Sequence, residues 1–165
     1  MQPETHRVPR AKPFPWLCPR CMKHQVFPAK IEYVLDVNHD GILHKVHIPE
    51  LTVPKCVTCG ELLFDNAADD QISNALRTQL GLLNPEQISQ NRQALGMSRA
   101  ELAERIGFTE QALTRWEENR GIQTRAADNL LRLFFALPAV RGALIGGGQN
   151  RQLGVSVDQA TSKVA

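Results

Sequence analysis

The chain has 165 residues, of which 42% are hydrophobic and 22% charged, and its formal net charge at pH 7 is only +2. It lacks both the apolar run of roughly 18 residues that a membrane span needs and the apolar stretch of a secretory signal. We therefore expect a soluble, cytoplasmic protein without a membrane partner, and charge alone does not predict a nucleic-acid partner.

The composition changes along the chain in a way that predicts two folded domains. Residues 1–66 contain all four Cys, all five His and most of the Pro, whereas residues 67–145 are rich in Leu, Ala and Arg. The expected parts are a flexible extension at 1–17, a cysteine-rich domain at 18–66, a linker helix at 67–83, a helical domain at 84–145 and a flexible tail at 146–165.

Two C-x-x-C pairs, CPRC at 18–21 and CVTCGE at 56–61, are separated by 34 residues. Cytoplasmic thiols stay reduced, and four thiolates from two tight turns form the closed tetrahedral shell that is typical of a structural zinc site. The predicted ligands are Cys18, Cys21, Cys56 and Cys59. Iron is an alternative ion for the same ligands, and four unrelated thiols or a thioredoxin-like redox pair are the alternatives to a metal site.

The segments IEYVLDV and ILHKVHI, on either side of NHDG, predict a β-hairpin between the cysteine pairs. His44 and His47 lie three residues apart on its second strand, so they point to opposite faces and are not expected to share a metal. Gly60 follows the second Cys of its pair, where a positive φ is favoured, and Met22 takes the same place in the first pair.

The remaining residues carry the start and stop signals of short helices. Ile72, Leu76 and Leu80 recur at helical spacing and predict the linker helix. Beyond it, the caps Asn84, Ser98, Thr109 and Thr124 and the stops Gly96, Gly107 and Gly121 predict helices at 85–95, 99–106, 110–119 and 125–137.

The second and third of these helices are joined so tightly that they must cross steeply, as in a helix-turn-helix. In the third helix, Leu113 and Trp116 fall on the side expected to face the core, whereas Gln111, Thr114 and Arg115 fall on the opposite side. Gln and Arg at i and i+4 suit bidentate contacts to adenine and guanine edges in the major groove. Arg99 begins the preceding helix and is a candidate for a phosphate contact.

Two alternatives to DNA binding remain open at this point. The polar face can be a solvated face of a helical bundle, and the chain can be an adaptor that binds only proteins. An enzyme is not expected, since the sequence shows no nucleophile beside a base and no phosphate loop. Residues 84–141 contain eight Arg and seven acids, so a DNA-binding protein of this kind would need two copies on a two-part site.

LAERIGFTEQALTRWEENRG resembles the Xre/Cro helix-turn-helix family, and its combination with CPRC and CVTCGE resembles the MqsA-type antitoxins over residues 18–141. The resemblance implies an α+β fold, with a small zinc-bound β-hairpin domain joined by a helix to an all-α helix-turn-helix domain. It implies zinc on the four Cys, base contacts by Gln111 and Arg115, and a homodimer formed by the C-terminal domain. It further implies repression of its own operon at a palindrome and a ribonuclease toxin bound by the N-terminal domain. A zinc-ribbon and helix-turn-helix regulator with no toxin is the alternative with the same sequence features.

Overall fold

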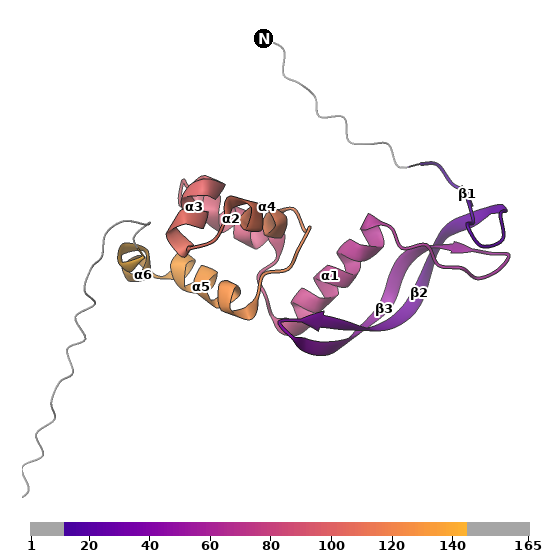
Figure 1. Ribbon diagram of the computed structural model, residues 1–165, viewed down its shortest axis with the longest axis horizontal. Coiled ribbons are helices and arrows are strands. Elements are labelled where there is room, and N and C mark those ends of the chain that lie inside the picture. Colours follow the sequence, from indigo (N-terminus) through magenta and orange to yellow (C-terminus); the bar gives the residue numbers. More distant parts are fainter. Residues whose placement is uncertain (1–11, 145–165) are drawn as a thin grey trace, which may run out of the picture.

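A computed structural model of the protein describes residues 12–144. An antiparallel sheet of strand order β1-β2-β3, one helix packed on that sheet and a group of short helices follow one another along the chain (Figure 1). The strands are β1 (Trp16–Leu17), β2 (His24–His39) and β3 (Ile42–Cys56), and the helices are α1 (Asn66–Leu80), α2 (Pro85–Ala94), α3 (Arg99–Ile106), α4 (Glu110–Glu117), α5 (Arg125–Ala136) and α6 (Pro138–Ala143). This arrangement confirms the predicted α+β class.

The hairpin of β2 and β3 turns through two residues, Asp40 and Gly41, whose φ angles are 55° and 76°. Two consecutive positive φ values define the type I′ turn that matches the twist of paired strands, and Asp-Gly suits it because both residues tolerate this region. The strands extend well beyond the predicted segments, with Val26 opposite Cys56 at the far end. β1 lies at 16–17, within the residues that were predicted to be a flexible extension.

Helix α1 covers one face of the hairpin. Its N-terminus is capped by Asp65, whose side chain accepts a hydrogen bond from the Ala68 amide, and it ends at Gly81 with a φ of 62°. The core between helix and sheet consists of Val46, Ile48, Leu51, Val53, Ala68 and Leu76. Gln71 of α1 also exchanges two 3.0 Å hydrogen bonds with the backbone of Thr52, which fixes the helix against β3.

The helices α2 to α5 form a second, separate core. Its buried residues are Leu83, Ile88, Leu102, Ala103, Ile106, Leu113, Trp116, Ala127, Leu131 and Phe134. The predicted caps are confirmed, since Asn84 and Ser98 each form a capping box and Thr109 and Thr124 each accept an amide hydrogen bond.

One predicted helix stop is wrong. α4 was expected to run to 119 and to stop at Gly121, but it ends at Glu117, and the residue with the positive φ, of 57°, is Asn119. Asn is among the residues that, after Gly, most often adopt this conformation. α6, which begins at Pro138, was not predicted as a helix. The predicted tail at 146–165 lies outside the described residues.

The hairpin turn touches the helical domain, whereas the cysteine end of the sheet lies at the far side of the molecule (Figure 1). The carboxylate of Asp40 accepts a 2.7 Å hydrogen bond from the backbone N–H of Arg125, at the start of α5. Arg132 of α5 donates a 2.7 Å hydrogen bond to the carbonyl of Gly81, the residue at which α1 ends. The two cores are therefore joined by polar contacts at several points.

Candidate functional site

The four cysteines form one cluster at the open end of the hairpin. Their Sγ atoms all lie within 4.8 Å of one another, and none is in a disulfide. The Cys18–Cys59 and Cys21–Cys56 Sγ distances are 3.5 and 3.6 Å. A tetrahedral shell with 2.3 Å metal–sulfur bonds has edges of about 3.8 Å, so the donor set fits a metal ion at its centre.

The electrostatics of the cluster also favour a cation. Burial opposes ionisation of Cys56, but backbone N–H groups of Cys59 and Thr58 and the neighbouring thiols lower its pKa to about 6. For Cys59, a hydrogen bond from the Glu61 backbone favours the thiolate, but burial and the other thiols outweigh it and raise the pKa to about 12. The cluster thus favours a thiolate at Cys56 and opposes one at Cys59, and a bound divalent cation would favour the thiolate at both.

The two turns that present the cysteines have the same backbone geometry. Gly60 and Met22, each directly after the second Cys of its pair, have φ values of 78° and 56°, as the sequence predicted. Gly60 donates a 2.9 Å hydrogen bond to the Cys56 carbonyl, and Met22 donates one of the same length to Cys18. A positive φ is thus required in both turns, but only one of them has a residue that tolerates it without cost.

We expect Gly60→Ala to destabilise the metal-bound protein by about 1–2 kcal/mol, because the left-handed region costs an L-residue about that much. A Cβ at Gly60 would meet nothing within 4 Å, so steric contact does not contribute. Met22→Gly, in the equivalent turn, should raise the stability slightly or leave it unchanged. Glycine removes the cost of the positive φ, but it also makes the unfolded chain more flexible, which offsets part of that gain. Thermal unfolding of both variants with metal bound checks this; equal losses in both would contradict it.

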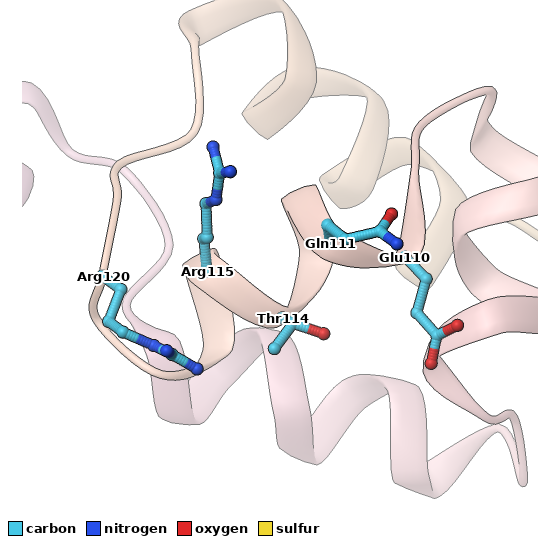
Figure 2. Close-up of a pocket in the computed structure, with 5 residues that line it drawn as sticks. All are labelled: Glu110, Gln111, Thr114, Arg115 and Arg120. Carbon is cyan, nitrogen blue, oxygen red and sulfur yellow. The ribbon is translucent and has the colours of Figure 1, made fainter.

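The outer face of α4 carries the residues predicted to bind DNA. Leu113 and Trp116 are buried on the inner side, while Gln111 and Arg115 are exposed and Thr114 is half-buried. A shallow hollow of about 270 Å³ runs along this face, lined by Glu110, Gln111, Thr114, Arg115 and Arg120. Figure 2 shows that four of these side chains project from α4 and that Arg120 comes from the loop after it.

A buried carboxylate fixes the orientation of α4. The Glu117 side chain is 1% exposed and accepts hydrogen bonds from both Nε (2.6 Å) and Nη2 (2.9 Å) of Arg92 in α2. Arg99, at the start of α3, donates to the same carboxylate at 2.7 Å. Burial raises the pKa of Glu117, but the hydrogen bonds and charges of the two arginines outweigh it and hold the pKa below its usual value. The ion pairs thus join three helices around the end of α4.

The structure places the predicted DNA-contacting residues in two groups. Gln111, Thr114 and Arg115 lie together on the hollow. Arg99 lies apart from them, one-third exposed, with its guanidinium paired to Glu117 and, at 3.2 Å, to Glu118. Arg120, which the sequence analysis did not select, lines the hollow beside Arg115 and also pairs with Glu118. It lies in the loop after α4, and the analysis of helix faces did not extend to loops.

The geometry defines the class of the helical half. α3 and α4 are joined by a short turn with a left-handed residue at Gly107, and the outer face of α4 is exposed, as in a helix-turn-helix. In agreement, residues 88–135 match the family model described as Helix-turn-helix. This match supports a DNA-binding regulator. A comparison with curated proteins finds no match to the chain. No helix in residues 12–144 is long and apolar enough to cross a membrane.

Proposed function

We propose that the protein is a sequence-specific transcriptional repressor that reads the major groove with Gln111 and Arg115. The observation that carries the proposal is their joint exposure on the outer face of α4, opposite the buried Leu113 and Trp116. The Gln111 amide offers the donor and the acceptor that adenine N7 and N6 require, and the Arg115 guanidinium offers the two donors that guanine O6 and N7 require. Thr114 on the same face and Arg99 at the start of α3 are the further proposed contacts, to a base edge and to phosphate.

Arg115→Ala is expected to weaken binding to a selected duplex by about 1–3 kcal/mol, because a bidentate contact to guanine has that magnitude. The duplex is chosen with the wild-type protein from a randomised pool, and affinity is measured by fluorescence anisotropy at fixed salt. Arg105→Ala is the matched control, since this exposed arginine of α3 contacts the carbonyls of Arg141 and Leu144 near α6. If the wild-type protein selects no sequence, a protein-binding adaptor replaces the repressor.

We propose zinc as the ion of the cysteine cluster and a structural, non-enzymatic role for it. Its support is a complete set of four thiol ligands, which leaves no coordination position for a substrate. Elemental analysis of the purified protein tests the ion. One iron per chain, with a coloured protein, would contradict zinc but leave the structural role in place.

We also propose that the repressor acts as a homodimer on a palindrome. Leu133 and Leu137, near the C-terminal end of α5, are 48% and 45% exposed and offer apolar surface to a second copy. Two copies would double the contacts of a domain whose own charge attracts DNA weakly. Sedimentation of the free protein and of its DNA complex tests the proposal, and one chain per duplex would contradict it.

The particular kind of repressor that we propose is an antitoxin of the MqsA type, whose N-terminal domain binds a ribonuclease toxin. Its support is the combination of a four-cysteine hairpin domain with a helix-turn-helix domain in the same order along the chain. Affinity purification of the tagged protein from its native host tests this. A small ribonuclease bound to residues 12–66 is the expected result, whereas its absence would favour a regulator without a toxin.

A further inference from the structure

A buried arginine connects α1 to the loop that follows the DNA-reading helix. Arg77 is 1% exposed, although it lies on the helix that packs against the sheet. Its guanidinium donates to the side-chain oxygen of Asn119 and, at 2.7 Å, to the carbonyl of Gly121. Burial lowers the pKa of Arg77, and the carboxylates of Glu86 and Asp70 oppose this shift. The loop supplies the two hydrogen-bond acceptors of this buried charge, and the two carboxylates offset part of its desolvation.

The loop is held from α1 at a second point. Asn119, with its positive φ of 57°, donates from its side-chain nitrogen to Asp70 at 2.7 Å. Both ends of the Asn119 amide are therefore bonded to side chains of α1. Within the helical domain, backbone hydrogen bonds from Glu118 and Arg120 to α4 and the surface pair of Glu118 with Arg99 hold residues 118–121. α1 adds the contacts to Asn119 and to the Gly121 carbonyl.

The loop in turn borders the DNA-reading face. Arg120 lines the same hollow as Gln111 and Arg115 (Figure 2). A Cβ added at Gly121 would lie 3.6 Å from the Cβ of Arg115, so the loop passes directly beside that residue. A shift of the loop would therefore change both the position of Arg120 and the space available to Arg115.

We propose that Arg77 is a positioning residue for DNA recognition: from the N-terminal half of the molecule it fixes loop 118–121, and thereby Arg120, against the reading face of α4. The proposal rests on the DNA-binding function proposed above. It assigns to α1 a part in recognition that the helix-turn-helix domain alone does not contain.

The test compares Arg77→Met with Arg125→Met in the full-length protein. Met is apolar and of similar length, so it removes both hydrogen bonds without leaving a large void. Arg125 donates from its side chain to the carbonyl of Leu80 and thus also links the helical domain to α1, but it does not touch the loop. We expect Arg77→Met to weaken binding to the duplex selected by the wild-type protein about tenfold, and Arg125→Met to leave binding within about twofold.

A double-mutant cycle with Arg120→Ala separates positioning from general stability. If Arg77 acts by placing Arg120, then Arg77→Met should have little further effect in the Arg120→Ala background, because residues that act through one contact are not additive. All affinities are measured well below the unfolding transition. Full additivity of the two changes, or unchanged affinity in Arg77→Met, would overturn the proposal.

Hydrogen exchange of the free protein tests whether Arg77 holds the loop, and this test does not depend on DNA binding. In Arg77→Met, amides of residues 118–121 should exchange about tenfold faster than in wild type, with no such change in Arg125→Met. Should the wild-type protein bind no duplex, the repressor proposal fails and with it the recognition role of Arg77. Faster exchange in loop 118–121 would then show only that Arg77 holds the loop. Unchanged exchange would overturn that structural role as well.

Discussion

A chelator that strips the metal is expected to unfold the cysteine end of the sheet while the rest of the chain keeps its structure. Cys18, Val26 and Cys56 form a small core of their own, with Trp16 and Leu63 packed around it. So small a core does not persist alone, and structural zinc contributes on the order of 10 kcal/mol to domains of this kind. The larger core beneath α1 contains none of these cysteines and should survive.

Hydrogen exchange with and without chelator measures this effect segment by segment. Protection should be lost at residues 16–28 and 54–63 and retained in α1 to α5. Cys56→Ser should reproduce the loss, because a serine hydroxyl does not replace a thiolate ligand. Val57→Ser, at the adjacent exposed position in the same turn, is the control and should bind metal normally. Unchanged protection after complete metal removal would show that the cluster does not hold this end together.

The second large effect is expected for Glu117→Gln, which should lower the free energy of unfolding by about 3 kcal/mol. The substitution keeps the shape of the side chain but removes the charge that Arg92 and Arg99 share. Arg92 is then left buried without its counter-charge, and this accounts for most of the loss. Urea unfolding followed by circular dichroism measures the change.

Glu118→Gln is the matched control, because it removes a neighbouring carboxylate that pairs with Arg99 and Arg120 at the surface. Exposed pairs contribute about 0–1 kcal/mol, so its effect should be small.

The difference in unfolding free energy between Glu117→Gln and wild type should also depend on pH. The pKa of Glu117 is lowered in the folded state, so its contribution is present above the unfolded pKa and is lost as the pH falls through the folded pKa. Equal losses of unfolding free energy in Glu117→Gln and Glu118→Gln would contradict the assignment of the buried ion pair to Glu117.

Local signals in the sequence predicted the helical domain well. Each cap depends on one side chain and an amide a few residues further on, so Ser98 and Thr109 mark the starts of α3 and α4 without any tertiary information. The cysteine cluster was predictable for a similar reason, since two short turns and a hairpin between them bring the four thiols together. The separation of the inner and outer faces of α4 follows from helical periodicity alone.

Long-range polar contacts were not predictable in the same way. Glu117 was not selected from the sequence, because its burial follows from where α2 places Arg92, 25 residues earlier. Arg77 similarly finds its acceptors 42 and 44 residues away. The lengths of β2 and β3 were underestimated because both strands continue through prolines, at Pro28, Pro49 and Pro54, which normally mark strand ends. The proposed DNA contacts of Gln111, Thr114, Arg115 and Arg99 stay predictions.

The hydrogen bond from the first amide of α5 to Asp40 reaches back 85 residues to the hairpin turn. A helix-turn-helix unit is usually treated as an independent domain that can be joined to any neighbouring domain. Here a transplanted segment 84–144 would arrive without the acceptor for Arg125 and without the α1 side chains that hold Asn119. Transfer of the helical segment to another chain should therefore succeed only when the hairpin and α1 are carried with it.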